Sequence, residues 1–181
     1  MPHPQYQSPP GYDLAALAEM IARVAHSGQT RFGGEPYINH PARIADSVWD
    51  ASPGDYITVA IAWLHDTIED TTVTRTALRD VGLSREIVDG VALLTRSPDE
   101  SYEHYIDRLI KFGSESVLTV KVADLHDNLR DLEAKFSDTK RAHLRERYIA
   151  ALVRISGELN RREAQDQVVR WQLDDVLGEA A

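Results

Sequence analysis

The sequence predicts an all-α protein. Apolar residues recur three or four positions apart in segment after segment, which is the spacing that places them on one face of a helix. We find no internal repeat and no alternation of strands and helices. Residues 117–122 have the β-branched content of a strand, but the helical spacing continues beyond them. We therefore expect a single helical bundle with a helical extension at its C-terminal end.

The first two helices are expected on either side of a glycine-rich loop. The first begins with Asp13 as its N-cap and ends before the loop at residues 29–36, which carries the cation Arg31. The second begins with Asn39 as its N-cap and has Pro41 in its first turn, where proline is well tolerated.

Further helices follow, each with an apolar face and each separated from the next by turn-forming residues. Their expected ranges are 57–70, 72–78, 84–94, 102–112, 116–132 and 139–160. We divide the chain into a flexible tail at 1–11, which has four prolines and a glycine, a folded domain at 12–160 and a polar, helical extension at 161–181.

Composition limits the classes of function. The 181 residues suit one domain, and 43% apolar with 27% charged residues is ordinary for a soluble globular protein. The absence of cysteine excludes disulfides and thiolate ligands, and no signal-peptide or membrane-span pattern occurs, so we expect a cytoplasmic protein. The net charge of −9 argues against a broad nucleic-acid surface but allows a small phosphorylated ligand held by a few arginines.

Residues 57–70 join an apolar helix face to a group of acidic residues and a histidine. His65 and Asp66 directly follow the apolar run, and Glu69 and Asp70 lie four residues after them, so all four share one end of the helix. Three carboxylates beside an imidazole repel one another unless a cation lies among them. The alternative is a solvated helix end with a chance His-Asp pair.

Four stretches of this chain resemble the HD-domain phosphohydrolases, and within them the hydrolase domains of RelA/SpoT-type alarmone enzymes and the small alarmone hydrolases. They occur in family order and at family spacing over residues 25–132. They are Ala25-His-Ser-Gly-Gln-Thr-Arg31, Gly34-Glu-Pro-Tyr-Ile-Asn-His-Pro41, Ala62-Trp-Leu-His-Asp-Thr-Ile-Glu-Asp-Thr71, and Val120-Lys-Val-Ala-Asp124 with Asn128-Leu-Arg-Asp-Leu132. The resemblance implies an HD-type helical bundle with metal-dependent hydrolase activity.

The resemblance also implies the metal ligands, which are His40, His65, Asp66 and Asp124. Two imidazoles and two carboxylates, with positions left for water, suit octahedral Mn²⁺, and other divalent metals fit the same donors. The alternatives are that His40 caps a helix and that Asp124 pairs with Lys121.

Glu69 and Asp70 resemble the family's acidic pair beside the metal-bound water. A divalent ion lowers the pKa of its water towards neutrality, and a nearby carboxylate can take the proton that the water releases. The alternative for these two residues is a solvated acidic face.

By the same resemblance, the substrate-binding residues are Arg31, Lys121, Asn128 and Arg130. Arginine forks onto phosphate oxygens or stacks on a base, although an ordinary surface ion pair is the alternative for Arg130. Phe32 departs from the family, since many alarmone hydrolases have a basic residue there, and we expect it either to stack on the base or to pack under the loop.

Three residues receive other interpretations. We place His26 in the core or behind the metal ligands. The second His-Asp dipeptide, His126-Asp127, is interpreted as incidental because the family motif runs through the residues on either side of it.

The expected function is hydrolysis of (p)ppGpp by a metal-activated water that attacks the 3′-diphosphate and releases pyrophosphate. The alternatives are an HD phosphohydrolase of another nucleotide such as NADPH, and a non-catalytic nucleotide sensor or antitoxin-like partner. We expect a small nucleotide as the partner, no nucleic acid and no membrane, and we leave a homo-oligomer open.

Overall fold

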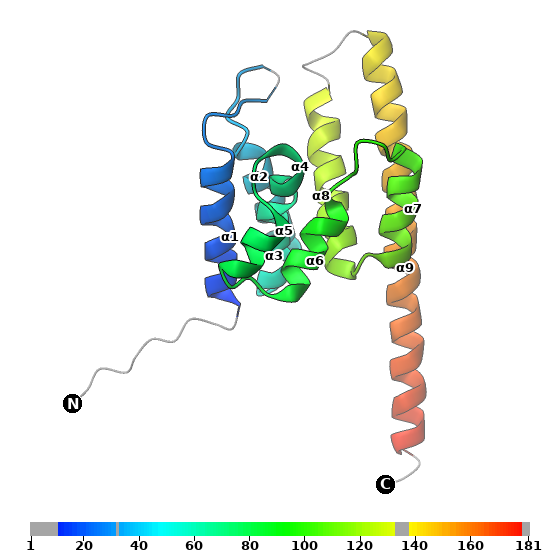
Figure 1. Cartoon of the computed structure of the whole chain (residues 1–181). Helices are drawn as coiled ribbons and strands as arrows, with labels where there is room; N and C mark the ends of the chain where they lie inside the picture. The colour runs from blue at the N-terminus through cyan, green and yellow to red at the C-terminus, as the bar shows by residue number, and fades with distance from the viewer. Residues whose placement is uncertain (1–10, 32, 133–137, 179–181) are drawn as a thin grey trace, which may run out of the picture.

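The computed structural model describes residues 11–31, 33–132 and 138–178, with the backbone alone for residues 138 and 168–178. In these ranges it has nine helices and no strand, so the all-α prediction is confirmed (Figure 1). None of these helices combines the length and the apolar character needed to cross a bilayer. The helices are α1 (Tyr12–Ala25), α2 (Asn39–Ala51), α3 (Tyr56–Leu64), α4 (Thr67–Asp70), α5 (Arg75–Asp80), α6 (Arg85–Leu94), α7 (Tyr102–Phe112), α8 (Glu115–Leu132) and α9 (Asp138–Gly178).

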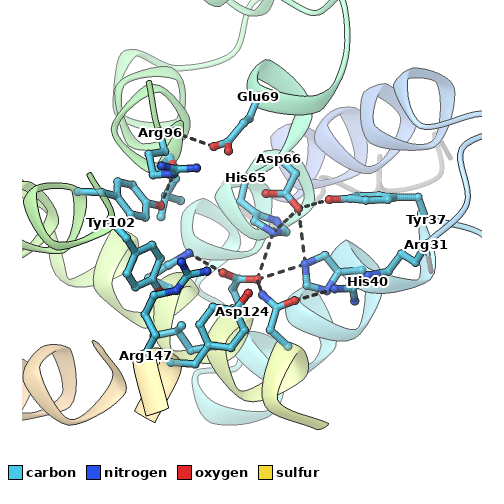
Figure 2. A pocket seen from close by; sticks show the side chains of 16 residues that line it. Arg31, Tyr37, His40, His65, Asp66, Glu69, Arg96, Tyr102, Asp124 and Arg147 are labelled. Carbon is cyan, nitrogen blue, oxygen red and sulfur yellow. Dashed lines mark hydrogen bonds and ion pairs between the residues drawn. The ribbon is translucent and has the colours of Figure 1, made fainter. Parts of the chain in front are cut away.

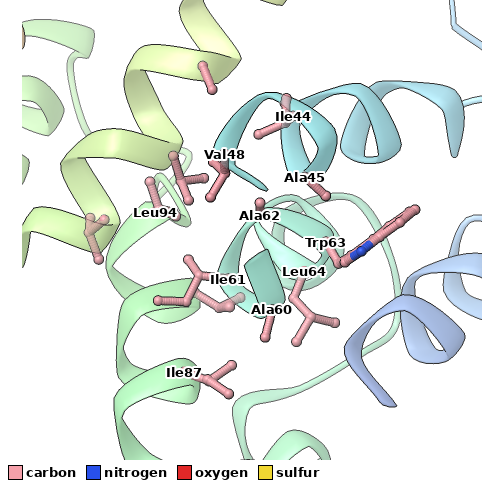
Figure 3. Close-up of a cluster of buried hydrophobic side chains, with 14 of the residues drawn as sticks. Ile44, Ala45, Val48, Ala60, Ile61, Ala62, Trp63, Leu64, Ile87 and Leu94 are labelled. Carbon is pink, nitrogen blue, oxygen red and sulfur yellow. The ribbon is translucent and has the colours of Figure 1, made fainter. Parts of the chain in front are cut away.

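Helix α3 lies at the centre of the core and packs against α1, α2, α6 and α8. Its residues 58–64 are all buried, so it is apolar around its whole circumference and needs neighbours on every side. Ile61 points towards α6, and Ala62 lies beneath α2 (Figure 3). The helix that precedes the His-Asp pair is therefore held rigidly on all sides.

The expected central helix at 57–70 is two helices, because the chain turns at His65-Asp66. Nδ1 of His65 lies 2.8 Å from the carbonyl oxygen of Ala62, and the hydroxyl of Thr67 donates to the carbonyl oxygen of Leu64 at 2.7 Å. In a continuous helix, backbone N–H groups would bind these two carbonyls. Side chains bind them instead, so α3 ends and α4 begins in a new direction.

Both predicted N-caps are wrong by one or two residues. Gly11 caps α1 in the left-handed region with φ 86°, and it lies so close to Tyr56 that an added Cβ would be 3.1 Å from that residue's Cβ. Asp13 therefore falls in the first turn of α1, where its charge still suits the helix N-terminus. The side chain of Asn39 donates to Glu35 at 3.1 Å rather than capping α2.

The last helix is longer than expected, because α9 runs without a break from Asp138 to Gly178. Its first half packs beside α7 and α8, and its C-terminal part projects beyond the bundle (Figure 1). Arg162 donates to the carbonyl oxygens of Gly113 and Ile110 at 2.7 and 2.8 Å, which ties α9 to the end of α7. The division at residue 160 stays a prediction, and residues 1–10 of the predicted tail at 1–11 lie outside the described residues.

A glycine sets the distance between the central helices. A Cβ at Gly90 on α6 would lie 2.9 Å from Cδ1 of Ile61 and 3.3 Å from Cγ2 of Val117, whereas a Cβ at Gly157 on α9 would meet nothing within 4 Å. We predict that Gly90→Val lowers the free energy of unfolding by about 1–3 kcal/mol through overpacking. Gly157→Val makes the same change in helix propensity in open space and should not destabilise the protein. Urea unfolding of both variants measures the difference, and equal stabilities would contradict this account.

Candidate active site

A cavity of about 230 Å³ opens where α2, α4 and α8 meet α7 and α9 (Figure 2). Its wall contains eight of the ten residues that the sequence analysis assigns to the site. They are Arg31, His40, His65, Asp66, Glu69, Lys121, Asp124 and Asn128. Residues that are distant in sequence thus face one cavity.

His65 is buried with a fixed tautomer. Because the carbonyl oxygen of Ala62 can only accept, Nδ1 of His65 carries the proton, and Nε2 presents a lone pair to the cavity. Nε2 is buried and has no hydrogen-bond partner among the described residues, although it lies 3.0 Å from Oδ2 of Asp66. A lone pair facing a carboxylate at this distance is unfavourable unless a cation lies near both. The pair therefore fits a metal ion.

His40 is also buried, at the start of α2. Its Nδ1 lies 2.7 Å from Oδ2 of Asp127, and its Nε2 lies 3.2 Å from Oδ1 of Asp124 and 3.5 Å from Oδ2 of Asp66. Burial by itself lowers the pKa of His40, but hydrogen bonds to these carboxylates outweigh it and raise the pKa to about 10. Nε2 of this ring therefore occupies a place where carboxylates favour a cation.

The predicted metal ligands converge on one part of the cavity. The ligand atoms of His40, His65 and Asp66 lie within 4.8 Å of one another, and Oδ1 of Asp124 lies 3.2 and 3.9 Å from the two Nε2 atoms. This set of two imidazoles and two carboxylates can hold a divalent metal. The structure thus has the His/Asp donor set of a metal site.

Asp124 also forms the ion pair with Lys121 that was the alternative interpretation of this residue. Its Oδ2 accepts from Nζ of Lys121 at 2.7 Å, and its Oδ1 accepts from Nδ2 of Asn128 at 2.5 Å. Burial raises the pKa of Asp124, but Lys121 and His40 outweigh it and hold the pKa well below its usual range. Asp124 is therefore an ionised carboxylate whose orientation is fixed by two neighbours on its own helix.

Tyr37 is a residue that sequence reasoning missed. Its phenolic oxygen lies 2.7 Å from Oδ2 of both Asp66 and Asp70, and burial together with these two carboxylates raises the pKa of the phenol. The ring stacks on His26 at a centroid distance of 4.7 Å, which puts His26 behind the site as expected. Tyr37 lies within one of the family stretches, so that stretch was the signal available.

The two residues of the predicted acidic pair, Glu69 and Asp70, lie in different surroundings. Glu69 lines the cavity, and its Oε2 accepts the backbone N–H of Arg96 at 2.8 Å. Burial, followed by the charges of Asp66 and Asp70, raises the pKa of Glu69 despite that hydrogen bond. Asp70 is not part of the cavity wall and is bound by Tyr37. The two carboxylates are therefore not equivalent.

The predicted substrate residues are also not equivalent. Arg31, Lys121 and Asn128 line the cavity, whereas Arg130 does not. The side chain of Arg130 is 61% exposed and pairs with Asp127 at 2.7 Å, which is the surface ion pair of the alternative interpretation. Phe32 lies outside the described residues.

A second wall of the cavity was not predicted. It consists of cationic and aromatic side chains from the loop after α6 and from α7 and α9. They are Arg96, Tyr102, Tyr105, Arg147 and Tyr148. The helical spacing marks these tyrosines only as core residues, and the sequence has no signal that α9 covers the site.

Arg147 in this wall lies against two tyrosine rings. Its guanidinium carbon lies 4.5 Å from the ring centre of Tyr102 and 5.5 Å from that of Tyr148. Its Nε and the hydroxyl of Tyr102 are buried and make no hydrogen bond within the described structure. Two polar atoms of this wall are therefore left without a partner among the described residues.

Asp127 corrects another interpretation. His126 is exposed, but Asp127 is only 7% exposed and bonds His40. The second His-Asp dipeptide is therefore not incidental, because its carboxylate contacts a predicted metal ligand.

The helical bundle and its His/Asp donor set are consistent with an HD-type hydrolase domain. Comparison with known proteins identifies sequence relatives. The chain is 35% identical over 150 residues to the guanosine-3′,5′-bis(diphosphate) 3′-pyrophosphohydrolase of Vibrio cholerae, covering 78% of this chain and 21% of that protein. It is 36% identical over 137 residues to the bifunctional (p)ppGpp synthase/hydrolase SpoT of Escherichia coli, covering 71% and 19%. The chain is thus homologous to one part of these SpoT/RelA-type proteins and spans about a fifth of the length of the curated relatives it matches.

A solved structure supports the fold. It is described as a metazoan orthologue of SpoT that hydrolyses ppGpp, and it aligns with a TM-score of 0.66 at 21% identity over 90% of this chain and 98% of that one. No protein-family profile matches the chain. The sequence comparison thus gives the relatives, and the solved structure independently supports the helical architecture.

We predict that His65→Ala abolishes binding of Mn²⁺, because it removes a nitrogen of the predicted donor set that is buried and has no hydrogen-bond partner among the described residues. The helical content should remain, since the core around α3 is apolar. The control is His126→Ala, which removes the exposed imidazole of the other His-Asp dipeptide. Calorimetric titration with Mn²⁺ measures both, and retained binding in the His65 variant would remove this residue from the site.

Proposed function

We propose that this protein is a metal-dependent phosphohydrolase that cleaves the 3′-diphosphate from (p)ppGpp. The products are GDP or GTP, with a free 3′-hydroxyl, and pyrophosphate. The observation that carries the proposal is the buried Nε2 of His65, which has no hydrogen-bond partner in the described part of the chain and faces Asp66 beside His40 and Asp124. The names of the sequence relatives support this choice of substrate.

We assign Mn²⁺ to the donor set of His40, His65, Asp66 and Asp124. The bound metal would supply an activated water and polarise a phosphoryl oxygen. Each ring presents Nε2 to the donor set because its Nδ1 is bonded elsewhere, which is the ring orientation that ligation needs.

Glu69 is the general base in this proposal. It lines the cavity, its raised pKa brings the carboxylate nearer to the working pH, and the N–H of Arg96 holds it in place. Its carboxylate takes the proton of the attacking water, and the resulting acid can return that proton to the departing 3′-oxygen. Asp70 acts differently, by fixing Tyr37 against the metal ligand Asp66.

The charges on the cavity wall match a nucleotide with several phosphates. Arg31, Lys121, Arg96 and Arg147 supply four cations, and burial of Lys121 is outweighed by Asp124 and the nearby tyrosines, which keep its pKa raised and its charge in place. Guanidinium groups fork onto phosphate oxygens, and aromatic faces beside Arg147 can stack on a base. The wall from α7 and α9 is thus our candidate for recognising the part of the nucleotide away from the 3′-diphosphate.

The test is hydrolysis by the whole chain with Mn²⁺, comparing ppGpp, pppGpp, GTP and NADPH, with identification of the products. We expect pyrophosphate and GDP or GTP from the first two compounds. Release of phosphate from NADPH without any pyrophosphate from (p)ppGpp would overturn the substrate assignment. Binding of (p)ppGpp without turnover would indicate a sensor instead.

We predict that Glu69→Gln lowers kcat by about 10²–10⁴-fold, because the change removes proton transfer and little else. Binding of Mn²⁺ should persist, since Glu69 is not among the proposed ligands. Glu86→Gln, at an exposed position on α6, is the control and should leave kcat unchanged. A kcat near that of the wild type in both variants would exclude Glu69 as the base.

We predict that Arg147→Met lowers kcat/KM for ppGpp by about 10–100-fold, the size expected for one charged hydrogen bond to phosphate. Arg130→Met removes an arginine that does not line the cavity and should have a much smaller effect. Steady-state kinetics of both variants would decide the matter. The opposite ranking would restore Arg130 as a substrate residue.

A further inference from the structure

The carboxylate of Asp127 on α8 gathers one histidine and three arginines. Its Oδ2 lies 2.7 Å from Nδ1 of His40 and accepts from Arg31 at 3.1 Å and from Arg43 at 2.9 Å. Its Oδ1 accepts from Nε of Arg43 at 2.7 Å and from Arg130 at 2.7 Å. Each oxygen therefore accepts more than one hydrogen bond, in a side chain that is 6% exposed.

The arginines around Asp127 are balanced by further carboxylates. Arg43 also bonds Glu35 at 2.6 Å, and Arg31 also pairs with Asp131 at 3.0 Å. The network joins the loop before α2, α2 itself and α8, and Arg31 extends from it into the cavity wall. It thus connects the start of α2, where His40 lies, to a residue that faces the proposed substrate.

We propose that Asp127 is a positioning residue for the metal site, which holds His40 with its proton on Nδ1 and its Nε2 towards Asp66 and Asp124. The inference rests on the metal site of the proposed function and extends it to a residue outside the donor set. The same carboxylate holds Arg31, so the metal ligand and a substrate-facing cation share one support.

The hydrogen-bond pattern gives the reason. An ionised carboxylate can only accept, so His40 must donate from Nδ1, which leaves the lone pair of Nε2 for a metal. Arg43 binds both oxygens of Asp127 in the two-point geometry typical of arginine and carboxylate, which fixes the plane of that carboxylate. The orientation of the His40 ring is thereby fixed from its Nδ1 side, away from the proposed metal.

Asp127→Asn is the informative change because it keeps the shape of the side chain and alters its hydrogen-bond pattern. An amide offers an acceptor oxygen on one side only, so it cannot accept from Arg43 and Arg130 at Oδ1 and also from His40, Arg31 and Arg43 at Oδ2. In the orientation that keeps the oxygen towards Arg130, the amide NH₂ group faces Nδ1 of His40 and donates to it. This stabilises the opposite tautomer, in which Nε2 carries the proton and cannot bind a metal.

The control is Glu35→Gln. It removes the same charge from the same network, and the bonds that its side chain makes go to Arg43 and Asn39 on α2. If Asp127 merely anchors α2 to α8, both variants should lower the melting temperature and leave metal affinity alone. If Asp127 positions His40, metal affinity should fall in Asp127→Asn and not in Glu35→Gln.

We expect Asp127→Asn to weaken Mn²⁺ binding by about 10–100-fold, as is typical when a residue that orients a metal-ligating histidine is lost. Glu35→Gln should stay within about twofold of the wild type. Electron paramagnetic resonance of free Mn²⁺ during titration gives the affinity of each protein, and circular dichroism confirms that each is folded. Equal affinities in the three proteins would overturn the proposal.

A second measurement observes the ring directly. In the Zn²⁺-loaded wild type, long-range ¹H–¹⁵N spectra should show His40 with Nδ1 protonated and Nε2 without a proton, and Asp127→Asn should change this pattern. An unchanged His40 signal in the variant would contradict the positioning role. If Asp127→Asn does not fold, Arg43→Gln loosens the same carboxylate without touching His40 and should also weaken Mn²⁺ binding.

These readouts use no nucleotide. A wild type that binds Mn²⁺ but does not cleave (p)ppGpp would refute the proposed function and leave the Asp127 test intact. A wild type that binds no divalent metal would overturn both.

Discussion

The hydrogen bond from Nδ1 of His65 to the carbonyl oxygen of Ala62 is the interaction on which the site depends. It ends the central helix, so the chain turns at Asp66 and α4 carries Glu69 to the cavity wall. It also leaves Nε2 as a buried acceptor with no partner among the described residues. Because α3 is enclosed by apolar neighbours on all sides, this arrangement is rigid before any ligand arrives.

Charge compensation is the second constraint. Asp66, Asp124 and Asp127 lie close together in a largely buried region, and carboxylates in such a place require cations or hydrogen-bond donors. Lys121 donates a hydrogen bond to Asp124, Tyr37 donates one to Asp66, and arginines donate to Asp127. What these partners leave uncompensated is the side of the cluster that faces the two Nε2 atoms, which is where we assign the metal.

Much of the fold was predictable because helix formation depends on residues that are close together in the sequence. The helices follow from apolar spacing, and most of their ends agree with the predicted ranges within a few residues. The errors have different causes. At His65 a side chain takes the place of a backbone donor. At Gly11 the close approach to Tyr56 needs a glycine, and the final part of α9 continues beyond the apolar stripe that predicted it.

By itself, the sequence determined the all-α class, the family stretches and a donor set of the right residue types, because each of these depends on residue identity and spacing along one segment. Only the tertiary structure decided which partners meet across segments. It separated Glu69 from Asp70, removed Arg130 from the cavity, and brought Asp127 to His40 and Arg147 to the cavity wall. Such contacts depend on how α2, α8 and α9 pack, and no local pattern encodes the neighbours that packing selects.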